Sequence, residues 1–142
     1  MYIRKATYHD APVIKTLLGQ LGYHTRLSVL VDQLDRLFGS EDHQVYVCER
    51  NNELVGFTTV HYLPQLGFDG GIAVISDVSV DETQKEQDIA AALEKYVREL
   101  ARKRNCERIM VLQTGRLDES ADFYAGQGYE PWSGCFIKYL PN

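Results

Sequence analysis

The chain has 142 residues, of which 44% are hydrophobic and 25% are charged. This length suits one domain with a buried core and is short for two, and the composition is that of a folded protein rather than a disordered or fibrous one. The net charge of −5 argues against a nucleic-acid partner, because a polyanion normally binds to a basic face. We therefore expect a single domain over residues 1–142.

The sequence has no feature that would direct it to a membrane. No apolar run approaches the roughly 18 residues of a membrane-spanning helix, and the opening segment MYIRKATYHD lacks the order of a secretory signal. We expect a cytoplasmic protein. The three cysteines and four histidines are scattered, with no CxxC pair and no metal-ligand spacing, which predicts buried free thiols and no metal site.

The first third of the chain predicts a short strand over residues 1–6 and two helices. Asp10 and Pro12 form a plausible cap and first-turn pair for the first helix, and Gly39 ends the second. Apolar residues recur at helical spacing in both, which indicates that both cover one face of a sheet. These residues are Ile14, Leu17, Leu18 and Leu21, then Leu27, Leu30, Val31, Leu34, Leu37 and Phe38.

Three strands are predicted next. Residues 44–50 and 53–63 flank Asn51-Asn52, and because asparagine tolerates positive φ, this pattern predicts a tight hairpin. Residues 70–80 are rich in β-branched side chains and predict a central strand. Strict alternation would place Ile75, Asp77 and Ser79 on one face of that strand, and Ser76, Val78 and Val80 on the other.

The remaining elements complete an α/β domain. From Asp88 the apolar residues recur with the period of a long helix, followed by a buried strand at 108–114, a short helix at 118–129 and a last strand at 135–140. The predicted order is β, α, α, β, β, β, α, β, α, β, which is a mixed sheet with helices on its faces.

The step from the central strand to the long helix suits a diphosphate, because a helix start presents free N–H groups and a positive dipole end. The order of elements, with VISDVSVDETQKEQDIAAALEKYV and ADFYAGQGY, resembles the GNAT superfamily of acetyl-CoA-dependent N-acetyltransferases over nearly the whole chain. The resemblance implies an α+β type of fold with a mostly antiparallel sheet and about four helices. It also implies transfer of an acetyl group from acetyl-CoA to a primary amine of a small molecule or protein, and pairing of two copies through their last strands.

In this family the central strand leads into a turn of the form Q/R-x-x-G-x-G/A that holds the CoA diphosphate. Placing Val80 on the family's valine puts Lys85 at the Q/R position, Asp88 at the first glycine and Ala90 at the Gly/Ala position. The resemblance also assigns the main chain near Val78 to the oxyanion. The implied cofactor-binding residues are Val78, Val80, Lys85, Gln87, Asp88, Ile89, Ala90, Ala91, Thr114 and Ser120.

Asp88 leaves two interpretations open. Its carboxylate could oppose the diphosphate, or it could cap the helix and point outward, leaving the N–H groups of residues 87–91 free. The alternative to an acetyltransferase is therefore a catalytically impaired binding or regulatory module with a degenerate CoA loop. Use of another acyl-CoA is also compatible with the sequence.

Two residues are candidates for catalysis. By resemblance, Tyr124 protonates the departing thiolate, although Tyr124 could equally pack in the core with Phe123 and Tyr129. Asp77 lies inside an apolar strand, so its carboxylate requires either a hydrogen-bonding partner or a wet cleft; it is a candidate general base, or a structural or substrate-orienting residue.

The acceptor amine is expected to contact residues near the first two helices and the end of the hairpin. Tyr23, His61 and Tyr62 are the candidates for this pocket. For each of them, ordinary packing in a loop or strand is the alternative.

Overall fold

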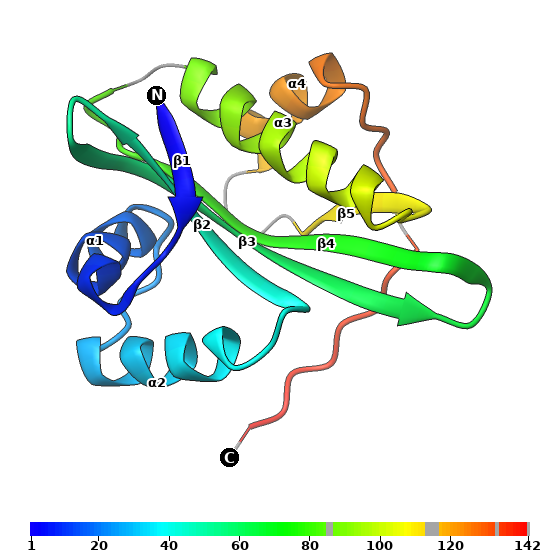
Figure 1. Cartoon of the computed structure of the whole chain (residues 1–142), viewed down its shortest axis with the longest axis horizontal. Helices are drawn as coiled ribbons and strands as arrows, with labels where there is room; N and C mark the ends of the chain where they lie inside the picture. The colour runs from blue at the N-terminus through cyan, green and yellow to red at the C-terminus, as the bar shows by residue number, and fades with distance from the viewer. Residues whose placement is uncertain (85–86, 113–116, 133, 142) are drawn as a thin grey trace.

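The computed structural model describes residues 1–84, 87–112, 117–132 and 134–141, with only the main chain described at residues 87 and 117–120. A five-stranded sheet lies between two helical layers (Figure 1). The strands are β1 (Tyr2–Lys5), β2 (His43–Arg50), β3 (Glu53–Gln65), β4 (Phe68–Val80) and β5 (Arg108–Val111). The helices are η1 (Tyr8–Asp10), α1 (Ala11–Gln20), α2 (Leu27–Phe38), α3 (Gln87–Lys103) and α4 (Leu117–Gly126).

The sheet has the order β1-β2-β3-β4-β5, so each strand lies beside its neighbour in sequence. The first three pairings are antiparallel, and β4 and β5 are parallel. The parallel pair requires a crossover, which α3 supplies. A mixed, mostly antiparallel sheet with helices on both faces is the predicted fold class, and it is confirmed.

The helices cover the two faces of the sheet in pairs. In Figure 1, α1 and α2 lie on one side of the sheet, and α3 and α4 lie on the other. The first face buries one apolar cluster, made of Ala6, Ala11, Ile14, Leu17, Leu30, Leu34, Val45, Val47 and Phe57. The opposite face packs against α3 through Tyr46, Val60, Tyr62, Ala73, Ile75, Val97 and Ala101, and through Cys48, Val55, Ile89 and Leu93.

Local sequence features set several element ends as predicted. Asp10 is the N-cap of α1, with Pro12 in its first turn, and Gly39 is the C-cap of α2. The Asp10 carboxylate accepts two hydrogen bonds from Arg4, each of 2.8 Å, which joins the start of α1 to β1. Because the Arg4 guanidinium stabilises the charged form, the pKa of Asp10 is lowered.

The predicted hairpin between β2 and β3 is confirmed. Asn51 and Asn52 have φ values of 54° and 66°, and the two strands stay in register from His43 opposite His61 down to Arg50 opposite Glu53, apart from one irregularity at Cys48. Two consecutive residues with positive φ match the twist of the flanking strands.

The predicted last strand is wrong. No strand forms within residues 134–141, and the red end of the chain in Figure 1 runs away from the sheet. Its apolar side chains are exposed: Phe136, Ile137, Tyr139 and Leu140. Alternating apolar residues make a segment compatible with a strand, but a strand also needs a neighbouring edge to receive its hydrogen bonds.

The three cysteines are free thiols, as predicted, but only Cys48 is buried. Cys106 is partly buried and Cys135 is exposed, so the prediction that all three are buried is wrong for these two. Within the described residues, no helix has both the length and the apolar character that crossing a membrane requires.

Candidate functional site

The central feature of the site is a β-bulge in β4. Thr59 of β3 lies opposite Asp77, whereas the next residue, Val60, lies opposite Ile75, so that Ser76 is an extra residue in β4. A bulge of this kind shifts the alternation of side chains by one position. It places Ile75 against α3 and Asp77 on the face covered by α1 and α2.

Because of the bulge, the faces of β4 differ in part from those that strict alternation predicts. Asp77 and Ser79 share one face, as expected, and Val78 lies on the other with the α3 cluster. Ile75, however, is on the Val78 face, and Ser76 reaches His61, which is on the Asp77 side. Strict alternation fails here because it assumes one residue opposite one residue.

The strands β4 and β5 separate next to the bulge. Their parallel pairing ends at Ile75 opposite Val111, and β4 continues beside β3 to Val80. The N–H of Asp81 donates to the Val55 carbonyl of β3 over 2.8 Å. Alternate residues of a strand point their main-chain groups to the same side. Since Asp81 points toward β3, Val78 and Val80 point their main-chain groups to the other side. On that side no strand of the described chain pairs with them.

Two buried hydroxyl groups hold this part of β4 in place. Thr58 Oγ1 donates to the Asp77 carbonyl over 2.9 Å, and Ser79 Oγ donates to the Leu17 carbonyl over 2.9 Å. The second bond connects β4 to α1 across the layer boundary. A buried hydroxyl that lost such a bond would leave an unpaired polar group, which costs about 1–3 kcal/mol, so both bonds stabilise the bulged geometry.

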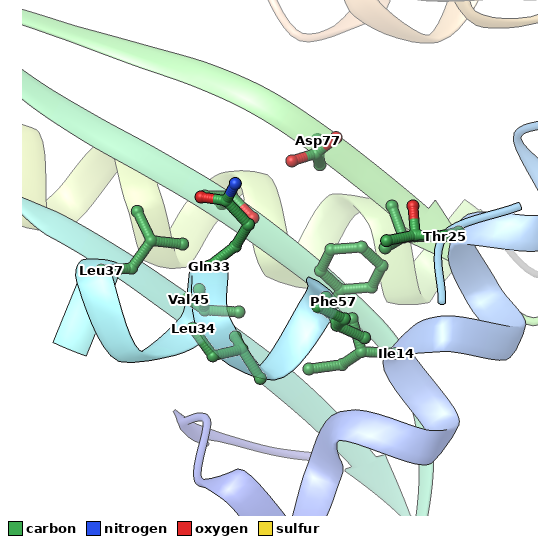
Figure 2. A pocket seen from close by; sticks show the side chains of 11 residues that line it. Ile14, Thr25, Gln33, Leu34, Leu37, Val45, Phe57 and Asp77 are labelled. Atoms are coloured by element: carbon green, nitrogen blue, oxygen red, sulfur yellow. The ribbon is translucent and has the colours of Figure 1, made fainter. Parts of the chain in front are cut away.

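A pocket of about 190 Å³ opens on the same face, between the sheet and the two N-terminal helices (Figure 2). Most of its lining is aliphatic or aromatic, and polar groups come from Thr25, Gln33, Thr59 and Asp77. Figure 2 shows Asp77 on one side of the pocket and Gln33 reaching toward it from α2. The apolar lining residues are Ile14, Leu18, Leu30, Leu34, Leu37, Val45 and Phe57.

The three predicted acceptor-site residues occupy different places. His61 lies beside the pocket face and contacts Ser76, its Nε2 atom being 2.8 Å from the hydroxyl oxygen. Tyr62, the next residue of β3, is buried on the opposite face, where Arg104 stacks on its ring at 3.8 Å. Tyr23 is 41% exposed in the loop between α1 and α2, near Thr25 but outside the pocket lining.

The predicted diphosphate turn is only partly within the described residues. After β4 the chain turns through residues 81–84, and α3 begins at Gln87. Asp88 is exposed in the first turn, one residue inside the helix rather than at its cap, whereas Ile89 is fully buried. Ala90 and Ala91 are partly buried. Lys85 and Thr114, and the side chains of Gln87 and Ser120, lie outside the described part.

Tyr124 lies on α4 in an aromatic cluster. Its ring packs edge-to-face with Phe123 and Tyr129, at centroid distances of 5.2 and 5.5 Å. Burial, followed by the nearby carboxylate of Glu94, raises the pKa of Tyr124. Glu94 is itself buried on α3 and pairs with Arg98 over 3.1 Å. The Tyr124 hydroxyl therefore keeps its proton at neutral pH, as a proton donor must.

Sequence reasoning missed part of this arrangement. Thr25, Gln33 and Thr59 line the pocket, and His43 contacts His61, with 2.9 Å between their Nδ1 atoms. A two-residue turn at Asn51-Asn52 pairs Arg50 with Glu53, and counting back from that pair would place Val60 opposite His43. The irregularity between Cys48 and Glu49 shifts the register by one residue and places His61 there instead, so no signal in the sequence pointed to the contact.

Comparison with known proteins identifies the family. The sequence matches the acetyltransferase (GNAT) family over residues 14–129. No curated protein matches the chain. Solved structures, in contrast, match it over nearly its full length.

Three of these structures show how far the likeness extends. A transcriptional regulator from Bacillus halodurans superposes with a TM-score of 0.88 at 20% identity, covering 98% of this chain and 99% of that one. A GNAT family acetyltransferase from Staphylococcus aureus gives 0.79 at 17% identity, covering 98% of each. An aminoglycoside acetyltransferase from an uncultured soil sample gives 0.78 at 22%, covering 99% and 96%. At these identities the structures share the fold, and the family match over most of the sequence shows that this chain belongs to the acetyltransferase (GNAT) family.

Proposed function

We propose that the protein transfers an acetyl group from acetyl-CoA to a primary amine with an apolar body. The observation that supports this most strongly is the position of Asp77. Its carboxylate lines the apolar pocket on one side, and the residues that follow it in β4 have main-chain groups without a partner strand in the described chain. An amine in the pocket and a thioester bound along the end of β4 would therefore meet beside Asp77.

The pocket supports the acceptor side of the proposal. A carboxylate in a mostly apolar lining attracts a cationic ammonium group, while the apolar surface accommodates a hydrocarbon or aromatic body. Thr25 and Gln33 add hydrogen-bonding groups at the pocket. We propose His61 and Tyr23 as neighbours of the acceptor; Tyr62, which is on the other face, is not part of this proposal.

The separation of β4 from β5 supports the binding of acetyl-CoA. Main-chain groups of Val78 and Val80 can bond an extended arm in the way that a neighbouring strand would. The start of α3 offers free N–H groups and a positive dipole end to a diphosphate. By family resemblance, Lys85, Thr114 and Ser120 would complete this binding site, and two copies of the chain would pair.

The proposed reaction forms a C–N bond and breaks the C–S bond of the thioester. Asp77 accepts a proton from the ammonium group, and the uncharged amine attacks the carbonyl carbon. The main-chain N–H of Val78 stabilises the oxygen anion that develops. The Tyr124 hydroxyl then gives a proton to the departing sulfur.

The proposal is tested by a thermal-shift titration of the full chain with acetyl-CoA, followed by an assay of thiol release with 2-phenylethylamine and hexylamine. Saturable binding should stabilise the protein by about 2.7 kcal/mol at a hundredfold excess over Kd. Binding without release of thiol, or no shift at all, would contradict the transferase and favour a binding or regulatory module. Propionyl-CoA in the same assay tests the choice of acyl group.

Variants at Asp88 show whether its charge opposes the diphosphate. Because the side chain is exposed, its repulsion is screened by water and should be about 1 kcal/mol or somewhat more. Asp88→Asn should then tighten acetyl-CoA binding by no more than about tenfold. Asp88→Gly, which also frees the main chain, is the matched comparison. A much larger gain with glycine than with asparagine would mean that the backbone, not the charge, limits binding.

A further inference from the structure

Three side chains form a row across the sheet, on the face that carries the pocket. Asp77 of β4 lies opposite Thr59 of β3, and Thr59 lies opposite Val45 of β2. All of them line the pocket. Directly opposed side chains of neighbouring strands have Cβ atoms about 4.5–5.5 Å apart, so one small molecule in the pocket can contact the whole row.

The hydroxyl of Thr59 is buried and unpaired. The residue is 5% exposed, and within the part of the chain that the structure describes its hydroxyl has no hydrogen-bonding partner. The hydroxyl of the preceding residue, Thr58, in contrast, donates to the Asp77 carbonyl over 2.9 Å. A buried hydroxyl that lacks a partner destabilises the site. Because Thr59 lines the pocket, a molecule bound there can supply the missing partner.

The other polar side chains near the pocket differ from Thr59 in this respect. Ser76 Oγ already donates to Asp77 Oδ2 over 3.3 Å. Gln33 is exposed and Thr25 is partly exposed, so water can bond to both side chains. Thr59 is therefore the polar group of the pocket that most needs a ligand.

The order of the row specifies the order of groups in that ligand. An ammonium group binds to the carboxylate of Asp77, a polar group bonds to the Thr59 hydroxyl, and an apolar group packs on Val45. A nitrogen and an oxygen on neighbouring carbon atoms match the short spacing of opposed side chains. We propose that the acceptor is a 2-aminoethanol with an apolar substituent on the carbon that bears its hydroxyl. This inference rests on the proposed function and names the class of amine.

A hydroxyl suits the position beside Thr59 better than other polar groups do. The Asp77 carboxylate is close to this position, so it would repel a second carboxylate, and a carbonyl oxygen would offer it lone pairs alone. A second ammonium group would bring two like charges together. A hydroxyl can accept a hydrogen bond from Thr59 and donate one to Asp77 at the same time.

The row also determines which atom of the amino alcohol lies near the thioester. β3 lies on one side of β4, and on the other side the pairing with β5 ends at Ile75 opposite Val111. Thr59 is therefore on the side of Asp77 away from the proposed site of acetyl-CoA. The nitrogen should be acetylated and the hydroxyl should not, so the product should be an amide rather than an ester.

The rest of the pocket suits a small apolar substituent. Its volume of about 190 Å³ is below the roughly 300 Å³ at which pockets for drug-sized ligands begin. Figure 2 shows Leu34 and Leu37 of α2 on the same side of the pocket as Val45. A phenyl or short alkyl group beside Val45 would therefore be covered by aliphatic side chains.

The inference is tested with 2-amino-1-phenylethanol and 2-phenylethylamine, which differ only in the hydroxyl. The wild type should have a kcat/KM about 10- to 100-fold higher for the hydroxylated amine, because the other amine leaves the Thr59 hydroxyl unpaired. One enantiomer should account for most of this preference, since the row fixes the positions of three groups around one carbon. Mass spectrometry and NMR should identify the product as the amide.

Substitutions at Thr59 assign the preference to its hydroxyl. Thr59→Val keeps the shape of the side chain and should bring the ratio of the two kcat/KM values close to one, whereas Thr59→Ser should keep the preference. Thr16, exposed on α1, provides the control, and Thr16→Val should behave as the wild type. Equal kcat/KM values for both amines in the wild type, or a preference that persists in Thr59→Val, would overturn the inference and leave the proposed function intact.

Binding provides a readout that does not depend on turnover. In calorimetric titrations, with and without CoA, 2-amino-1-phenylethanol should bind the wild type about 10- to 100-fold more tightly than 2-phenylethylamine, and Thr59→Val should lose the difference. This difference in a wild type that releases no thiol from acetyl-CoA would contradict the transferase but retain the amino alcohol site. Equal affinities, or no binding of either amine, would overturn the inference.

Discussion

At the scale of single residues, the site depends on polar groups whose environment sets their chemistry. Tyr124 is the clearest example, because burial and the carboxylate of Glu94 both raise its pKa. Both effects disfavour the phenolate, since one removes water and the other adds negative charge. Such a hydroxyl holds its proton over the whole range in which an enzyme works, so it stays available as the proton donor that the proposed reaction requires.

This predicts the behaviour of Tyr124→Phe. Turnover should fall about 100-fold, the lower end of the effect of a lost general acid, while the affinity for acetyl-CoA stays the same. Because the pKa of Tyr124 is raised, the wild type should keep its rate toward alkaline pH instead of losing it below the ordinary tyrosine value of about 10.

Tyr129→Phe is the matched control. The Tyr129 hydroxyl is buried and has no hydrogen-bonding partner among the described residues, so removing it should not lower turnover. Equal effects of the two substitutions in kinetic assays would assign both hydroxyl groups to packing and remove the acid role of Tyr124.

At the scale of elements, the hairpin and the bulge position the site along the sheet. The Asn51-Asn52 turn begins the pairing of β2 and β3, and the irregularity at Cys48 then shifts that pairing by one residue, which brings His43 opposite His61. The bulge at Ser76 then sets which side chains of β4 face the pocket. The two features differ in one respect: the turn is encoded in residues that prefer its conformation, whereas serine has no particular preference for a bulge.

The hairpin gives a prediction about stability. Asn52 has a φ of 66°, where an ordinary L-residue is strained by about 1–2 kcal/mol. Asn52→Val should lower the free energy of unfolding by about that amount, and Asn52→Gly should leave it nearly unchanged or raise it slightly. Urea denaturation measures both. Equal stability of the valine and glycine variants would show that the turn relaxes to another conformation.

At the scale of the whole molecule, two apolar layers pack on the two faces of one sheet. Leu17 of α1 is buried on one face of the sheet, and Leu93 of α3 is buried on the other; each is 1% exposed. Both clusters contain residues of β2 and β3. Since the two layers share these strands, neither layer can unfold without disturbing the other.

This predicts cooperative unfolding. Leu17→Ala and Leu93→Ala should each destabilise the protein by about 2–5 kcal/mol, through lost burial and the cavity left behind. Each should shift one common transition, seen alike by near-UV and far-UV circular dichroism. Two separated transitions in either variant would show that the layers unfold independently.

Much of the fold could be predicted because its information is local. The spacing of Leu30 and Leu34 is sufficient to indicate a helix, and Asn51-Asn52 is sufficient to indicate a tight turn. The family match then supplies what no local pattern can, which is the expectation of acetyl transfer. In the site, Asp77 was a candidate from its polarity alone, because a carboxylate in an apolar strand requires an explanation.

The sequence by itself determined where nearly every helix and strand lies, because periodicity and turn residues act over a few positions. Only the tertiary structure decided which polar groups meet. The bulge that joins Ser76 to His61, the opposite faces of His61 and Tyr62, and the absence of a strand within residues 134–141 all depend on which residue of one strand lies beside which residue of another. That register is set by the packing of whole layers, and no short stretch of sequence contains it.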